Sequence, residues 1–174
     1  MTNTEIKTER LILRALRATD AKAIVGLAGD ADVARMTARI PHPYTLQDAD
    51  QWIARAVEGG EIVFAIVHDG ALIGCADYKP EENGCAELGY WIGKPFWNKG
   101  FATEATRAVA AHAFVSGKIR TLSAGHFTDN PASARVLEKL GFTPSGEGNW
   151  ECVARGEDVP CVLFRLEAAG LRAA

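Results

Sequence analysis

The stretch from residue 62 to residue 127 constrains the fold of this chain more than any other part of the sequence. Its first part, IVFAIVHDGALIGCADY, contains two β-rich runs joined by Asp69-Gly70, a dipeptide typical of a tight β-hairpin. The turn sequence PEENG then leads into a strand, a helix and a further strand, expected at residues 85–93, 102–116 and 119–127. Antiparallel strands followed by one strand–helix–strand crossover predict a mixed α/β fold.

Further elements are expected on both sides of this stretch. Thr45, with Asp48 three residues later, has the pattern of a capping box, and Asp20 or Thr19 is expected to cap the first helix. The expected helices lie within residues 18–30, 43–60 and 130–142, and the expected strands within residues 10–16, 148–155 and 159–167. The predicted order is β-α-α-β-β-β-α-β-α-β-β, and a length of 174 residues predicts one domain, residues 1–174.

The composition is that of an ordinary globular protein, with 48% apolar residues, 24% charged residues and a formal net charge of −3. This charge gives no general attraction to nucleic acid or to anionic membranes, so neither is expected as a partner. No apolar run approaches the ~18–20 residues of a membrane span, and the first ten residues lack the apolar core of a signal peptide. The scattered cysteines, Cys75, Cys85, Cys152 and Cys161, predict reduced thiols in a cytoplasmic protein without a metal site.

The sequence WIGKPFWNKGFATEA (91–105) places a glycine-containing bend between the end of a strand and the first turn of a helix. The first N–H groups of a helix have no partner inside the helix, and the helix dipole puts partial positive charge there. Gly100 and Ala102 leave room for a close approach. Thr103 adds a hydroxyl and Lys99 adds a mobile cation. The bend therefore predicts an anion site, suited to a diphosphate, although its spacing matches neither common glycine-rich phosphate loop.

A second segment, DNPASARVLEKLGF (129–142), has the markers of a helix at both ends. Asn130 is expected to cap this helix, Pro131 takes its first position and Ser133 its third. Gly141 is expected to end it. Each of these residues has a sufficient structural reason to be there.

The bend and this segment, together with TERLILR (8–14), resemble the GNAT superfamily of acyl-CoA-dependent N-acyltransferases, and in particular the branch of the ribosomal-protein-alanine N-acetyltransferases. The resemblance extends from Thr8 to about Leu166. It implies a central, mostly antiparallel twisted sheet with helices on both faces and a β-α-β cofactor-binding crossover. It also implies transfer of an acetyl group from acetyl-CoA to a primary amine, either a protein N-terminus or a small molecule.

The resemblance also implies which residues bind the cosubstrate. The family's diphosphate loop falls on residues 97–102, where Trp97 replaces the usual Gln or Arg. The strand ELGYWIG is similar to the one whose main chain pairs with the pantetheine arm, and Asn130 matches the asparagine that faces the cofactor. The implied cofactor-binding residues are Tyr90, Trp91, Ile92, Asn98, Lys99, Gly100, Phe101, Ala102, Thr103 and Asn130.

The expected reaction needs a proton for the departing sulfur and a route for the proton of the amine. Many members of the family protonate the sulfur from a tyrosine, but that position is Leu137 here, so Ser133 is the candidate in its place. Ser133 could instead be a helix-start residue that bonds only its own backbone. Glu87 is the expected base, because alternation puts it on one strand face with Gly89 and Trp91. His126 is the alternative base, and an α-amine, with a pKa of ~7.7–8, could react without one.

Residues 38–45 and 146–159 are the segments expected to recognise the acceptor. Two other functions compete with the enzyme. A catalytically degenerate acyl-CoA-binding sensor is suggested by the missing tyrosine, and a protein that binds ATP or NAD at the same bend is disfavoured by the loop spacing. The sequence leaves a homodimer open.

Overall fold

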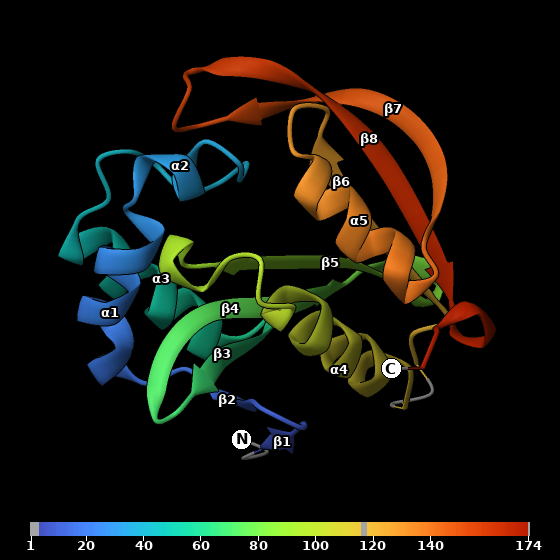
Figure 1. The fold of residues 1–174 in the computed structure, drawn as a ribbon, viewed down its shortest axis with the longest axis horizontal. Coiled ribbons are helices and arrows are strands. Elements are labelled where there is room, and N and C mark those ends of the chain that lie inside the picture. The colour runs from blue at the N-terminus through green and yellow to red at the C-terminus, as the bar shows by residue number, and fades with distance from the viewer. Residues whose placement is uncertain (1–3, 116–117, 174) are drawn as a thin grey trace.

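Eight strands form one open sheet in the order β1-β2-β3-β4-β5-β6-β8-β7 in the computed structural model, which describes residues 4–115 and 118–173 (Figure 1). The strands are β1 (Ile6–Lys7), β2 (Ile12–Ala15), β3 (Ile62–His68), β4 (Ala71–Pro80), β5 (Cys85–Ile92), β6 (Thr121–Phe127), β7 (Thr143–Cys152) and β8 (Glu157–Glu167). The helices are α1 (Ala21–Ala28), α2 (Ala31–Ala34), α3 (Leu46–Glu58), α4 (Phe101–Val115) and α5 (Pro131–Leu140). Only the β5–β6 pair is parallel, which confirms the predicted mixed α/β fold with a mostly antiparallel sheet.

Short-range signals fix the ends of several elements. The Thr45 side chain accepts a hydrogen bond from the N–H of Asp48, and the Asp48 carboxylate accepts one from the N–H of Thr45, which is the predicted capping box of α3. Helix α5 begins after Asn130, whose Oδ1 accepts the N–H of Ser133 at 3.2 Å. The helix ends at Gly141 with φ +100°, a left-handed conformation that favours glycine.

Two hydrophobic clusters lie on opposite faces of the sheet. Alternation along β3 turns Phe64 and Ile66 toward one cluster and Ala65 toward the other. The first cluster is covered by α4 and α5, and the second by α1 and α3 (Figure 1). The sheet therefore has helices on both faces, as expected, and each side chain of the central strands points to one of these two faces.

The structure also differs from the sequence-based expectation at several boundaries. Strand β1 and helix α2 were not expected, and β7 begins at Thr143 rather than near residue 148. The first predicted helix is divided, with a 3-10 turn at Ala18–Asp20 before α1. The Asp20 carboxylate accepts the N–H of Arg17 there and forms an ion pair with Arg14. The predicted last residue of the fourth helix, Ser116, lies outside the described residues.

The parallel pair β5–β6 is only partly formed. Its register joins Cys85 to Thr121, Ala86 to Leu122 and Glu87 to Ser123. Beyond Glu87, β5 continues to Ile92 and β6 to Phe127, and no further pairing joins these described residues. We call the unpaired part, Leu88–Ile92 opposite Ala124–Phe127, the sheet opening. It leaves main-chain polar groups of two neighbouring strands without the partners that a complete sheet would supply.

Candidate active site

A cavity of about 580 Å³ lies at the sheet opening. Its wall includes residues of β5 and β6, the bend before α4, the first turns of α4 and α5, and the segment after α2. All the predicted site residues except Lys99 line it. Lys99 instead places its ammonium group 5.6 Å from the centre of the Phe96 ring.

The bend before α4 has a backbone that only a few residues adopt readily. Asn98 has φ +61° and Gly100 has φ +80°, both in the left-handed region. The indole Nε1–H of Trp97 donates a 2.6 Å hydrogen bond to the carbonyl of Ile92, at the end of β5. Trp97 therefore holds the bend against the strand, which gives this departure from the family pattern a structural role. The Ile92 carbonyl is therefore already occupied by the hydrogen bond from Trp97.

The N-terminal sequence TERLILR anchors the same bend from outside. Arg10 donates a hydrogen bond from Nη1 to the carbonyl of Lys99 at 2.9 Å, and one from Nε to the Glu104 carboxylate at 2.7 Å. Thr8 donates to the same carboxylate at 2.6 Å. Because Glu104 lies in the first turn of α4, these contacts fix the bend relative to the helix. The pairing of TERLILR with the bend, noted in the sequence, is thus a physical contact.

Two hydroxyl groups meet on the α4/α5 face of the sheet opening. The Tyr90 hydroxyl lies 2.7 Å from Ser133 Oγ and 3.4 Å from the carbonyl of Ser133. Burial raises the pKa of Tyr90 well above its ordinary value, while its hydrogen bond with Ser133 acts in the opposite direction. Leu137 is fully buried in the core. A leucine carries no ionisable group, so this position offers no proton donor, whereas Tyr90 and Ser133 each carry a hydroxyl proton.

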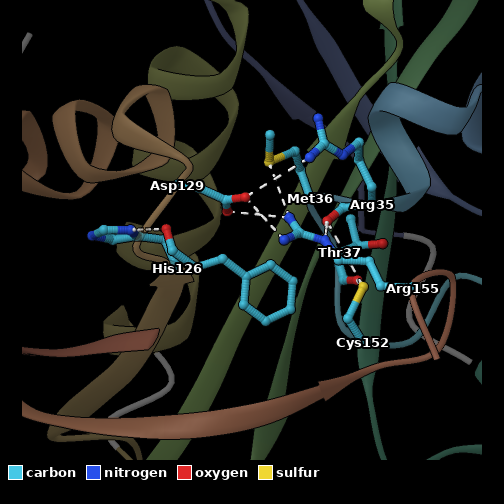
Figure 2. A network of polar contacts seen from close by, with 8 residues as sticks. Arg35, Met36, Thr37, His126, Asp129, Cys152 and Arg155 are labelled. Atoms are coloured by element: carbon cyan, nitrogen blue, oxygen red, sulfur yellow. Dashed lines mark hydrogen bonds and ion pairs between the residues drawn. The ribbon is translucent and has the colours of Figure 1, made fainter. Parts of the chain in front are cut away.

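The sequence pointed to Ser133 and to the main chain of Tyr90, but not to the Tyr90 hydroxyl. Alternation along β5 could have suggested it, because residues 88, 90 and 92 face the side opposite Glu87. Asn130 lines the cavity while its side chain caps α5. His126 also lines the cavity, and its Nδ1 is 2.7 Å from the carbonyl of Phe127 (Figure 2).

Charged side chains gather on the other face of the sheet opening, under α1 and α3. Glu87 Oε2 is 3.2 Å from Arg39, and the other amino group of Arg39 is 3.0 Å from Glu61. Asp77 on β4 lies directly opposite Gly89 of β5 and also lines the cavity. Burial, followed by the negative charge of Glu61, raises the pKa of Asp77 to about 7. Asp77 was not expected from the sequence, and Arg39 was expected only as part of the acceptor-recognition segment 38–45, because no local motif connects either residue to β5.

Two further cations line the cavity without having been predicted. Arg135 and Lys139 stand four residues apart on α5, so they share one face of that helix. Their spacing was visible in the sequence, but nothing there showed that this face of α5 borders the bend.

A three-segment clamp is made by Arg155, Asp129 and the main chain of residues 35–37, of which Met36 and Thr37 line the cavity (Figure 2). Arg155, in the turn between β7 and β8, donates to both oxygens of Asp129 at 2.9 and 3.1 Å and to the carbonyl of Arg35 at 2.8 Å. The Cys152 thiol donates to the carbonyl of Thr37 at 3.3 Å. The C-terminal hairpin is thereby joined to the segment after α2, which supports the expectation that both regions border one site.

Two negative findings concern residues 4–115 and 118–173 only. Within them, no three potential metal ligands among the His, Cys, Asp and Glu side chains lie close enough together to hold an ion. Nor is any helix in these ranges both long and apolar enough to cross a membrane.

Comparison with known proteins agrees with this geometry. A family model described as an acetyltransferase (GNAT) domain matches residues 10–143. The N-acetyltransferase p20 of Bacillus licheniformis is 31% identical over 166 residues, covering 91% of this chain and 93% of that relative. The ribosomal-protein-serine acetyltransferase of Escherichia coli is 31% identical over 86 residues, covering 48% of each chain.

Solved structures share the fold at lower sequence identity. A GNAT-family acetyltransferase from Bacillus anthracis superposes with a TM-score of 0.82 at 23% identity, covering 94% of this chain and 98% of that one. RimL, a ribosomal L7/L12 alpha-N-protein acetyltransferase solved in complex with coenzyme A, superposes with a TM-score of 0.84 at 19% identity and the same coverages.

The fold and the site together define a transferase of acyl groups, built around an opened sheet and a glycine bend. More particularly, the chain belongs to the GNAT acetyltransferase family and is an N-acetyltransferase.

Proposed function

We propose that this N-acetyltransferase takes its acetyl group from acetyl-CoA and transfers it to an α-amine, either the N-terminus of a protein or a small primary amine. The observation that carries the proposal is the sheet opening, where one cavity connects the bend before α4 with the Tyr90–Ser133 pair. The name of the coenzyme A complex of RimL and the name of the Escherichia coli relative support the choice of donor and of acceptor class.

The residues present fit such a donor. At Gly100, a Cβ atom would meet only Arg10, at 3.3 Å, so the bend is open on its other sides. The unpartnered N–H groups at the start of α4, with Arg135 and Lys139 on α5, suit a polyphosphate. The free edge of residues 88–91 suits an extended amide-containing arm, which would pair with the strand as a neighbouring strand does.

The hydroxyl pair has a direct part in the chemistry. When the carbon–sulfur bond breaks, the electron pair stays on sulfur, and in this proposal Ser133 gives that sulfur a proton. Tyr90, 2.7 Å away, can restore the proton of Ser133. General acid help of this kind contributes about 10²–10⁴-fold to a rate. The proton leaving the amine needs an acceptor as well, and the carboxylates of the opposite face are available, including Glu87, which stays a prediction.

The acceptor class follows from amine chemistry. An α-amine has a reference pKa of ~7.7–8, so a useful fraction is neutral near pH 7.5, whereas a lysine side chain at ~10.4 is almost wholly protonated. A carboxylate base with a pKa near 7 can deprotonate the first far more easily than the second. The site is therefore better matched to protein N-termini or weakly basic amines.

The test is thiol release from acetyl-CoA with a panel of acceptors. The panel contains alanyl and seryl tripeptides with free N-termini, the same tripeptides acetylated at the N-terminus, and a tripeptide whose only amine is a lysine side chain. We expect release only with free N-termini at pH 7.5. Faster release with the lysine peptide would overturn the proposed acceptor class. If none of the amines in the panel causes thiol release, the acyl-CoA-binding sensor becomes the better interpretation.

A further inference from the structure

The Tyr90–Ser133 hydroxyl pair and the Asp77 carboxylate lie on opposite faces of the sheet opening. Tyr90 points to the α4/α5 face, where its hydroxyl contacts Ser133. Gly89, the preceding residue, faces the α1/α3 side, where its position opposes Asp77 on β4. A Cβ atom placed on Gly89 would lie 3.1 and 3.3 Å from the two carboxylate oxygens of Asp77. The Asp77 carboxylate therefore lies directly over a strand position that carries no side chain.

This position is also where the sheet begins to open. Pairing of β5 with β6 ends at Glu87, so Gly89 is the first residue on its face beyond the paired part. The Tyr90–Ser133 hydroxyl pair thus lies on one face of β5, and the Asp77 carboxylate lies on the other face, at Gly89. Both border the same cavity.

The three carboxylates of this face are not equivalent. Arg39 forms ion pairs with Glu61 and Glu87, at 3.0 and 3.2 Å. In the described parts of the chain, no side chain or N–H group donates a hydrogen bond to Asp77, and its carboxylate still borders the cavity. A part-buried carboxylate without a donor is costly to keep charged, so it is suited to accept a proton.

We propose that Asp77, rather than Glu87, receives the proton that the acceptor amine loses, and that Glu87 instead positions Arg39. This inference rests on the proposed function, because it requires an amine in the sheet opening. The nitrogen forms its bond to the acetyl carbon and gives one proton to an Asp77 oxygen. The carbon–sulfur bond breaks, and the sulfur takes a proton from Ser133.

The charged surroundings give Asp77 a suitable proton affinity. Burial and the charge of Glu61 raise its pKa to about 7, Arg39 opposes that rise, and Glu87 adds to it. An ordinary aspartate, at ~3.9, is about four pKa units too weak a base for an α-ammonium group at ~7.7–8. Other titratable groups on this face include Lys79 and the buried thiol of Cys75, on the same strand as Asp77, together with the Tyr44 hydroxyl and the Arg14–Asp20 ion pair.

Four single substitutions test the assignment through the pH profile of kcat/KM with the alanyl and seryl tripeptides. We expect Asp77→Asn to lower kcat/KM by about 10²–10⁴-fold. It should also remove the limb of the profile near pH 7, that is, the rise in kcat/KM as Asp77 loses its proton. Arg39→Gln should move that limb to higher pH, and Glu61→Gln and Glu87→Gln to lower pH, because each changes the charge that Asp77 experiences. Asp50→Asn, an exposed charge change on α3, is the control and should leave the profile unchanged.

Loss of the limb in Glu87→Gln, together with its retention in Asp77→Asn, would overturn the assignment and restore Glu87 as the base. A merely structural role for Asp77 predicts a lower rate with the limb intact, which would also overturn it.

A measurement without substrate separates this inference from the proposed function. Since the pKa of Asp77 rises from 3.8 to about 7 on folding, the folded chain keeps a proton between these values that the unfolded chain has lost. The free energy of unfolding of the parent should therefore fall, relative to that of Asp77→Asn, as pH rises from about 4 to 7, and then level off. A constant difference would overturn the inference. Parent protein that shows this difference but acetylates no amine would overturn the proposed function instead.

Discussion

Gly100 and Gly70 have almost the same backbone conformation, with φ +80° and +78°, but different surroundings. Gly100 borders the cavity, and Gly70 lies in the β3–β4 hairpin with open space around it. Replacement by valine strains both positions equally, because a β-branched residue resists this conformation. Only Gly100→Val should abolish acetyl-CoA binding in a calorimetric titration, since only there does the new side chain enter the bend. Equal affinities of the two variants would remove the bend from the binding site.

The roles of Ser133 and Tyr90 can be distinguished by removing each hydroxyl group in turn. We expect Ser133→Ala to lower kcat by roughly 10–10³-fold, with acetyl-CoA affinity little changed. Tyr90→Phe should lower kcat less, because it removes only the group that restores the Ser133 proton. Both losses should shrink above the thiol pKa of ~8.5, where the sulfur leaves without a proton.

The control for this pair is Ser145→Ala on β7, an exposed serine that does not line the cavity. Its kcat should equal that of the parent at every pH. Full turnover of Ser133→Ala at low pH would leave Ser133 as a helix-start residue only.

At the scale of elements, the three-segment clamp connects the β7–β8 hairpin to the segment after α2. The Arg155 side chain is only 14% exposed and makes four hydrogen bonds, two of them to the Asp129 carboxylate. Arg155→Ala should lower the free energy of unfolding by about 1–3 kcal/mol, measured by urea denaturation. Arg35→Ala is the matched control, because Arg35 is half exposed and approaches Asp129 only to 3.9 Å. It should cost less than about 0.5 kcal/mol.

The clamp should also depend on pH. The hydrogen bond from Arg155 lowers the pKa of Asp129. The stabilisation is therefore complete above the ordinary pKa of ~3.9 and disappears as pH falls through the lower folded value. The difference in unfolding free energy between parent and Arg155→Ala should follow this course, and a difference that persists at the lowest pH would contradict it.

Elements with strong local signals were predictable from the sequence, and those without such signals were not. The starts of α3 and α5 are fixed by the side chains of Thr45, Asp48 and Asn130, and the end of α5 by the left-handed conformation of Gly141. In each case, a short window of sequence contains the whole cause. The start of β7, TPSGEGNWEC, contains proline and glycine that local rules assign to a turn. It is a strand because the far end of β8 pairs with it: Thr143 lies opposite Arg165, 22 residues further along the chain.

The same distinction holds at the scale of the whole molecule. The bend and Ser133 were found because each belongs to a contiguous pattern. The cavity confirms that these segments lie together, while the roles assigned to them stay predictions. Asp77, Arg39 and Glu61 come from three separate segments, and only the sheet register and the loop after α2 bring them together. Tyr90 was assigned by its main chain, because the contact of its hydroxyl with Ser133 crosses from a strand to a helix.

Binding of coenzyme A should be visible in the backbone of the sheet opening. If the arm of the donor occupies the free edge, amide hydrogen exchange should slow at residues 88–91 and 124–127 on addition of coenzyme A. The β3–β4 hairpin, whose strands pair with each other from Ile62 to His68 with one bulge, serves as the internal control. Gly100→Val should show no slowing at either place. Uniform slowing across the sheet would instead indicate general stabilisation by binding.

The incomplete pairing of β5 and β6 also has a mechanical side. Three residue pairs form a seam near one end of the two strands, and beyond it the strands diverge. Because the two strands are joined only near one end, a small rotation of one strand there produces a larger displacement at the open end. The width of the opening therefore depends on the packing of Ala86 and Leu122, both fully buried and outside the cavity lining. A change of volume at these residues alters how tightly the opening grips whatever enters it, although neither residue touches it.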